Sequence, residues 1–327
     1  MSVDLGEFKF IDSVLKKSLP MGEFAPERRG WLPVGDDCAM FDGWLVTKDL
    51  SVEGTHFRMD WSSPEQAVEK HIVSNVSDIS SMGGVPRFAV CGLCVNRDWS
   101  DEVRTRVGKA LAEGFARRGI ALIGGDTVAG ECGMFSTTLL GTCAGGKPLV
   151  RSGAKPGDGV YVAGTLGKSA AGLWLLLNHP EARDEFPTLV NYHLAPVIDE
   201  RCGARLVEFG VSGACMDISD GLSSELNHLA GASHVGIEID CEKLPVAPEV
   251  LRMAERYGLD PLDFALNGGE EYELLFTESF KNDIFLEKGA LPGGAYRIGT
   301  VVEGTEVRMR GLDGKVSIVK AQAWSHL

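Results

Sequence analysis

The sequence has little positive charge and no long apolar run, and both absences exclude classes of protein. Its 327 residues include 32 Lys and Arg against 46 Asp and Glu, which gives a formal net charge of -14. General binders of a nucleic-acid backbone place many cations on phosphates, so this composition argues against that class. No segment is apolar and long enough to span a bilayer. The first residues, MSVDLGEFKF, lack the basic start and apolar run of a signal peptide.

Two motifs begin but are not completed. Cys91 and Cys94 form a C-x-x-C inside the strand-like RFAVCGLCVN, and no second pair or nearby histidine completes a zinc site. The eight cysteines are therefore expected to be reduced and structural, which indicates a cytoplasmic protein. GTLGKSAAG ends like a P-loop, but Val162 stands where the first glycine is required. This excludes a P-loop nucleotide-hydrolysing enzyme.

The elements that are present predict an α/β (α+β) fold with two layered domains. The periodicity indicates strands over 44–50, 87–96 and 120–126, and helices over 63–84 and 100–119. Alternating strands and helices are typical of a layered α/β domain. The Gly- and Pro-rich RSGAKPGDGVYVAG then opens a second unit, so we predict domains over 1–148 and 149–327.

The helix expected over 63–84 has a clear start and a defined inner face. Ser63 and Gln66 form a capping box. Its apolar stripe consists of Val68, Ile72, Val76 and Ile79. His71, Asn75, Asp78 and Met82 follow on an adjacent face, which places the Asp78 carboxylate at the edge of the core.

Aspartates recur where apolar elements end. They are Asp36, Asp37, Asp49, Asp78, Asp126, Asp217 and Asp220. Each alone is most simply a turn or helix-cap residue. Together they are expected to converge on one edge of a sheet, where unpaired like charges are costly and imply bound cations. Oxygen ligands without His or Cys indicate Mg²⁺, and the glycine pairs beside them, such as Gly124–Gly125, let backbone approach a phosphate.

An ordered series of motifs over nearly the whole chain resembles the thiamine-monophosphate kinase family. The series is GEF, GDDCA, VEGTHF, NVSDISSMG, LIGGDT, RSGAKPGD, GKSAAGL, DISDGL and GGEEYELLFT. This family shares a superfamily with aminoimidazole ribonucleotide synthetase and selenophosphate synthetase. The resemblance implies a kinase that converts thiamine monophosphate to thiamine diphosphate with ATP and several Mg²⁺ ions. It also implies a homodimer that pairs through its N-terminal sheets, with no nucleic-acid or membrane partner.

The resemblance also implies roles for individual residues. The implied metal ligands are Asp37, Thr47, Lys48, Asp49, Asp78, Asp126, Asp217 and Asp220. The implied nucleotide contacts are Gly125, Asp126, Arg151 and Ser219, and the implied substrate contacts are His56, Glu270 and Trp324. No residue is implied as a dedicated catalytic base.

Three positions depart from the family pattern. Lys48 replaces a small hydroxyl residue, so only its carbonyl is expected to reach a metal. Val128 and Ala129 stand where Thr and Arg are common, which weakens any nucleotide contact there. Glu271 replaces an Asp, which we expect to be a mild change.

Two alternative functions stay open on the residues alone. One is a related ATP-dependent synthetase, although the selenium branch needs a reactive cysteine near the N-terminus and none precedes Cys38. The other is a non-catalytic nucleotide-binding protein, which loss of several acidic ligands would favour. Those ligands are present.

Overall fold

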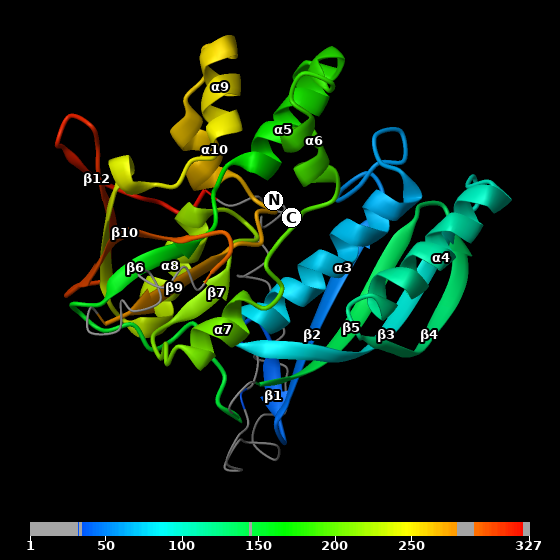
Figure 1. Ribbon diagram of the computed structural model, residues 1–327, viewed down its shortest axis with the longest axis horizontal. Coiled ribbons are helices and arrows are strands. Elements are labelled where there is room, and N and C mark those ends of the chain that lie inside the picture. Colours follow the sequence, from blue (N-terminus) through cyan, green and yellow to red (C-terminus); the bar gives the residue numbers. More distant parts are fainter. Residues whose placement is uncertain (1–31, 33–34, 144–145, 280–290, 323–327) are drawn as a thin grey trace, which may run out of the picture.

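The structure, a computed structural model, describes residues 32, 35–143, 146–279 and 291–322. These residues form two sheets, each covered by helices, so the predicted two-layer α/β organisation is confirmed (Figure 1). The last strand of the first sheet ends at Cys143 and the first strand of the second begins at Gly159. None of the helices within the described ranges is long and apolar enough to cross a membrane.

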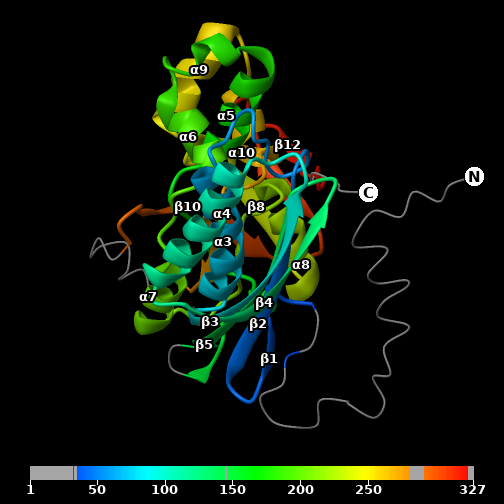
Figure 2. The same ribbon diagram turned by 90° about the vertical axis from the view of Figure 1, so that its right-hand side faces the viewer.

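Within the part of the chain that the structure describes, helices cover one face of the first sheet and leave the other face open (Figure 2). Its strand order is β1-β2-β5-β3-β4, where only β3 and β4 are parallel. The strands are β1 (Ala39–Phe41), β2 (Trp44–Val52), β3 (Gly84–Asn96), β4 (Ala121–Gly130) and β5 (Met134–Cys143). The helices α3 (Pro64–Ser81) and α4 (Asp101–Ala116) lie side by side on the same face (Figure 2).

The start and inner face of α3 agree with the sequence predictions. Ser63 and Gln66 form both hydrogen bonds of the capping box, and Pro64 occupies the first turn. Val68, Ile72, Val76 and Ile79 are almost completely buried, and they pack with Leu45, Phe135 and Leu139 of the sheet. The periodicity of the sequence was sufficient here because a capping box and an apolar stripe are local features.

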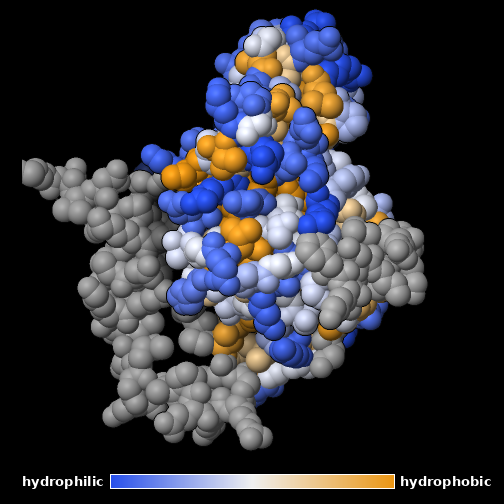
Figure 3. All heavy atoms as spheres, turned by 90° about the vertical axis from the view of Figure 1, so that its left-hand side faces the viewer, coloured by the Kyte–Doolittle hydropathy of each residue, from blue (hydrophilic) through white to orange (hydrophobic). Residues whose placement is uncertain are grey.

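The open face of the first sheet carries large apolar side chains. Leu50, Val90 and Val128 are 50%, 39% and 56% exposed. Leu122 and Ile123 on the edge strand β4 are also exposed. On the side of the second domain that faces away from the first, apolar residues instead stand in small groups between hydrophilic ones (Figure 3). Among the described residues, the open face is thus an apolar surface beside β4, an edge strand that pairs on one side only.

The second domain is built on a sheet with strand order β12-β11-β8-β10-β6-β9-β7. The strands are β6 (Gly159–Ala163), β7 (Cys215–Asp217), β8 (Gly236–Asp240), β9 (Leu274–Glu278), β10 (Ala295–Val302), β11 (Val307–Arg310) and β12 (Val316–Ile318). The helices are α5 (Lys168–Asn178), α6 (Pro187–Leu194), α7 (Cys202–Glu208), α8 (Leu222–Ser233), α9 (Pro248–Tyr257) and α10 (Pro261–Asn267). Two short 3-10 helices, η3 (Pro180–Ala182) and η4 (Cys241–Lys243), complete it.

The two domains meet along the C-terminal half of α3. The Cα of Gly203 in α7 lies so close to this helix that an added Cβ would be 1.6 Å from the Ser80 carbonyl oxygen. Only glycine allows backbones to approach in this way. The α3 helix also contacts β7, so the end of a strand in the second sheet lies beside a helix of the first domain.

The cysteines have no partner of their own kind. Among the described residues, all eight are free, and Cys38, Cys91, Cys202, Cys215 and Cys241 are buried. The expectation that the cysteines are reduced and structural stays a prediction.

Candidate active site

A cavity of about 880 Å³ lies between the two domains. The first domain contributes residues of β2, the segment after it and α3. The second domain contributes the segment after β7, the segment after α10 and one side of α5. A cavity with polar groups converging from two domains is a common form of active site.

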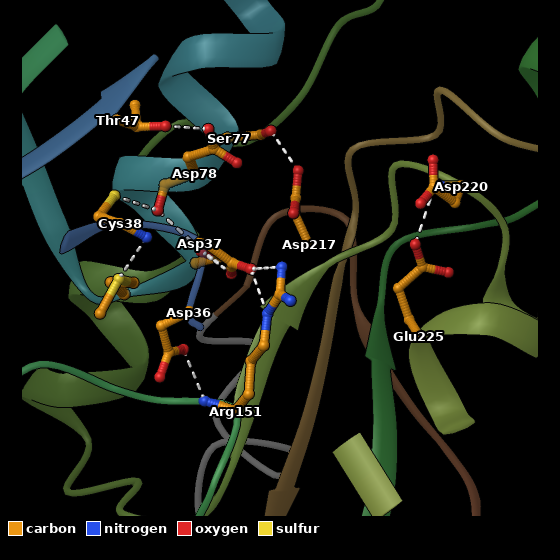
Figure 4. A network of polar contacts seen from close by, with 12 residues as sticks. Asp36, Asp37, Cys38, Thr47, Ser77, Asp78, Arg151, Asp217, Asp220 and Glu225 are labelled. Atoms are coloured by element: carbon orange, nitrogen blue, oxygen red, sulfur yellow. Dashed lines mark hydrogen bonds and ion pairs between the residues drawn. The ribbon is translucent and has the colours of Figure 1, made fainter. Parts of the chain in front are cut away.

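Carboxylates from both domains line this cavity. Figure 4 shows those of Asp37, Asp78 and Asp217 near one another, whereas Asp220 lies apart, beside Glu225. Asp37 precedes β1, Asp49 lies on β2 and Asp78 lies on α3. Asp217 ends β7 of the other sheet and Asp220 follows it. The expectation of a single sheet edge was therefore wrong, because the two sheets contribute separately and Asp78 comes from a helix between them.

Three of these carboxylates, those of Asp37, Asp78 and Asp217, have a hydroxyl or guanidinium partner. The Thr47 hydroxyl donates to Asp78 Oδ2 at 2.5 Å, and the Ser77 hydroxyl donates to Asp217. Arg151 donates through Nε at 2.8 Å and Nη2 at 2.6 Å to Asp37 Oδ1. These contacts balance part of the negative charge that the cluster concentrates.

Burial makes this cluster electrostatically unfavourable. It raises the pKa of Asp217 to about 8, with the nearby Asp37 charge adding to the effect. It also raises the pKa of Asp78, and Asp49 contributes next. A nearby cation stabilises the ionised form of a carboxylate whose pKa is raised in this way. Such pKa shifts concentrate at functional sites.

The donor chemistry of the cluster fits magnesium. The cavity carboxylates and the Thr47 hydroxyl are hard oxygen donors of the kind that Mg²⁺ prefers. Within the described ranges, however, no three His, Cys, Asp or Glu side chains lie close enough together to hold one ion.

Most of the residues that the sequence singled out lie on the cavity wall. They are Asp37, Thr47, Lys48, Asp49, His56, Asp78, Arg151, Asp217, Ser219, Asp220 and Glu270. The His56 ring accepts a hydrogen bond at Nδ1 from the Val52 N–H at 3.1 Å. The Lys48 ammonium instead donates to Ser136 at 2.6 Å, so its side chain is used away from the carboxylates. Trp324 lies outside the described residues.

Gly125 and Asp126 do not join the cavity of this chain. Both lie on the edge strand β4, and the described cavity wall does not include them. Cα pairing places Leu50, Ser136, Gly92 and Asp126 in one row across the sheet. Three strand spacings separate Asp126 from β2, which is about 14 Å. Because side chains alternate along a strand, Asp126 faces the open side, whereas neighbouring rows carry Thr47 and Asp49 toward α3.

The structure adds Lys70 to the residues considered from sequence. Its side chain is 7% exposed, lies in the cavity wall and pairs with Glu270 at 2.7 Å. Lys70, Ser74 and Asp78 are spaced by four residues and share one helix face, so their spacing in the sequence already indicated that Lys70 lies on the side of Asp78. The helix face predicted from sequence to reach the site instead carries His71 and Asn75, and both are completely buried in the core.

Glu271 is a buried carboxylate beside the start of α5. It is completely buried, and its carboxylate accepts a hydrogen bond from the Ser169 N–H at 2.8 Å in the first turn of α5. Burial raises its pKa to about 8. A folded-state pKa above the unfolded value means that the folded carboxyl keeps a proton that the unfolded chain releases.

We therefore expect Glu271→Gln to stabilise the protein in a pH-dependent way. Wild-type stability should fall as pH rises from about 4.5 to about 8, whereas glutamine keeps the acceptor for Ser169 without ionising. The free energy of unfolding of the variant should exceed that of wild type by about 2–4 kcal/mol more at pH 8.5 than at pH 5. Urea unfolding at the two pH values measures this. A difference that is independent of pH would contradict it.

Two family models match the chain. They are the AIR synthase related protein N-terminal domain over residues 35–145 and the C-terminal domain over residues 155–311. A curated thiamine-monophosphate kinase of Aquifex aeolicus is 36% identical over 331 residues, covering 99% of this chain and 98% of the relative. The Bacillus subtilis enzyme of the same name is 36% identical over 255 residues, 75% of this chain and 77% of the relative.

Solved structures agree with this placement. A structure described as AaThiL complexed with AMPPCP and TMP has a TM-score of 0.84 and 35% identity, and covers 99% of this chain and 97% of that one. The hydrogenase maturation protein HypE of E. coli has a TM-score of 0.68 at 24% identity, which shows a shared fold alone. The motif order, the two-domain fold and these relatives together show that the chain belongs to the thiamine-monophosphate kinase family.

Proposed function

We propose that this protein transfers the γ-phosphoryl group of ATP to thiamine monophosphate, forming thiamine diphosphate and ADP. The observation that carries the proposal is the convergence of Asp37, Asp49, Asp78 and Asp217 from both domains in one cavity, whose lining also includes Glu270 and His56. The similar AaThiL structure is described as binding an ATP analogue and TMP. The cytoplasmic location stays a prediction.

The carboxylate end of the cavity would hold the phosphates through magnesium. The proposed ligands of several Mg²⁺ ions are the Thr47 hydroxyl, the Lys48 carbonyl and the carboxylates of Asp37, Asp49, Asp78, Asp217 and Asp220. When bound, such ions neutralise the phosphates and allow two anions to meet in line. Arg151 and Ser219 lie on the same wall and would contact the nucleotide. A guanidinium suits this role because it pairs with phosphate as it does with Asp37 here.

The proposed reaction needs no dedicated base. The acceptor is a phosphate monoester whose second pKa is about 6, so it is mostly dianionic at neutral pH. One of its oxygens attacks the γ-phosphorus as the bond to ADP breaks. The protein then contributes positioning and charge neutralisation, which agrees with a cavity rich in carboxylates. It also agrees with the two buried histidines, His71 and His193, because burial lowers their pKa values to about 3.

The function is tested by incubating the protein with ATP, Mg²⁺ and thiamine monophosphate and following thiamine diphosphate by chromatography. We expect product only when Mg²⁺ is present. Absence of product with a folded, ATP-binding protein would overturn the proposal and favour a non-catalytic nucleotide-binding role.

Free thiamine is expected to be a very poor acceptor. Its hydroxyl would need a base, and it lacks the phosphate through which the metal would hold it. The rate with free thiamine should therefore be at least about 100-fold below that with the monophosphate, since a positioned base is typically worth that much. Comparable rates, abolished by one Asp→Asn change that leaves ATP binding intact, would show that a base exists.

We also propose that the protein is a homodimer formed through the open face of the first sheet. The exposed Leu50, Val90 and Val128 would be buried there, and an unpaired β4 edge would be covered. Asp126 lies on this face, about 14 Å from β2 by strand spacing, so its predicted role requires a second copy. Each cavity would then receive Asp126 and Gly125 from the partner subunit. Light scattering at micromolar concentration should give twice the monomer mass.

A further inference from the structure

Lys70 is a buried cation that joins the two domains across the cavity. Its ammonium donates to Glu270 Oε2 at 2.7 Å and to the His56 carbonyl oxygen at 3.0 Å. Lys70 and His56 belong to the first domain, whereas Glu270 belongs to the second. One side chain therefore contacts both of the described residues that the sequence marks as substrate contacts.

The segment that carries Glu270 is held in an unfavourable backbone conformation. Glu270 has φ +61° and Tyr272 has φ +56°, in the left-handed region that non-glycine residues rarely adopt. The Glu270 N–H donates to the Ser219 carbonyl at 2.7 Å, and the Tyr272 N–H donates to the Ile218 carbonyl at 2.8 Å. Backbone strain of this kind persists where the surroundings fix it, and it concentrates at binding sites.

Lys70 supplies the positive charge that balances Glu270. The other basic group beside this carboxylate oxygen is His193, whose Nδ1 is 3.6 Å away and 3.1 Å from the Ser169 hydroxyl. Burial lowers the pKa of His193 to about 3, so the ring is neutral at pH 7. A carboxylate paired with an ammonium presents little net charge, but its second oxygen still accepts a hydrogen bond.

This charge balance decides which of two groups on the acceptor Glu270 can recognise. Thiamine carries a thiazolium cation and an aminopyrimidine with an exocyclic amino group. An unpaired buried carboxylate would attract the cation, whereas the paired carboxylate at 26% exposure in the cavity wall suits an N–H donor. The geometry therefore favours recognition of the amino group.

We propose that Lys70 is a positioning residue that fixes the Glu270 carboxylate for recognition of the acceptor's exocyclic amino group. This rests on the proposed function and deepens it, because it names the group through which the second domain selects the substrate. The ion pair makes that selection depend on contact between the two domains.

The test compares three acceptors in wild type and in Lys70→Met. They are thiamine monophosphate, its analogue with the amino group replaced by a carbonyl oxygen, and a thiophene isostere with no thiazolium charge. Wild type should prefer thiamine monophosphate to the carbonyl analogue by about 10- to 100-fold in kcat/KM, the worth of a hydrogen bond to a charged group. In Lys70→Met the acceptor KM should rise, that preference should fall to about threefold or less, and the KM for Mg·ATP should stay unchanged.

A second, partly buried ion pair provides a matched control. Lys168 and Glu273 lie 3.0 Å apart, and both side chains are 13% exposed. The described cavity wall includes neither of them. Lys168→Met removes the same kind of ion pair and should keep the preference for the amino group. The double variant Lys70→Met/Glu270→Gln should lose no more preference than Glu270→Gln alone, because the two residues act as one unit.

Each outcome separates this inference from the proposed function. If wild type makes no thiamine diphosphate, the proposed function fails. If wild type is active and Lys70→Met keeps the wild-type preference and acceptor KM, Lys70 is only structural and the inference fails. The inference also fails if the kcat/KM of wild type falls more with the thiophene isostere than with the carbonyl analogue, because Glu270 would then recognise the cation.

Discussion

Asp217→Asn is expected to abolish most of the activity while making the metal-free protein more stable. Asp217 is 3% exposed, and its carboxylate lies near those of Asp37 and Asp49. Asparagine keeps an oxygen for the Ser77 hydroxyl but cannot ionise. The free-energy cost of holding the buried Asp217 carboxyl protonated, or of ionising it beside Asp37, then disappears, so the melting temperature without Mg²⁺ should rise by a few degrees.

Activity should change in the opposite direction. A ligand to phosphate-bound metal contributes to transition-state charge neutralisation, so kcat/KM should fall by at least about 100-fold. Mg·ATP should also raise the melting temperature of the variant less than that of wild type, since binding to the folded state stabilises it. Thermal melts with and without Mg·ATP, together with steady-state kinetics, measure these effects.

Asp158→Asn is the matched control for this prediction. Asp158 is also a buried carboxylate of the second domain, 8% exposed, but it accepts the Lys155 N–H and the described cavity wall excludes it. It should keep wild-type kcat/KM. A sharp fall in the metal-free melting temperature of Asp217→Asn, with activity lost in proportion to unfolding, would show that Asp217 is structural.

Co-expression of two inactive variants is expected to restore activity. In a symmetric dimer, a subunit with Asp126→Asn still has an intact Asp217 cavity, and a subunit with Asp217→Asn still offers Asp126. A heterodimer of the two therefore contains one site in which both residues are wild type. Random pairing should recover about a quarter of wild-type activity, and a purified heterodimer about half.

The geometry of the sheet makes this outcome specific to sharing between subunits. If Asp126 acted within its own chain, every site in the heterodimer would carry one defect and no activity would return. Asp78→Asn paired with Asp217→Asn is the control, because both residues line the cavity of the same chain. Recovery in that control, or none in the first pair, would rule out the shared site.

The sequence was sufficient for features that depend on neighbouring residues. The capping box at Ser63, the apolar stripe of α3 and the exclusion of a P-loop at Val162 all rest on spacings of a few residues. Ordered motifs also identified the family, because nine short signals in one order are very unlikely to coincide by chance. These signals need no knowledge of packing.

Only the tertiary structure decided which carboxylates meet. Ser77 and Asp217 are 140 residues apart, and Lys70 and Glu270 are 200 apart, so no local period relates them. Strand register decided that Asp126 faces the open side of the sheet, away from Thr47 and Asp49. Burial decided the pKa of Glu271, because the cost of ionising a carboxyl depends on how much water its folded surroundings exclude.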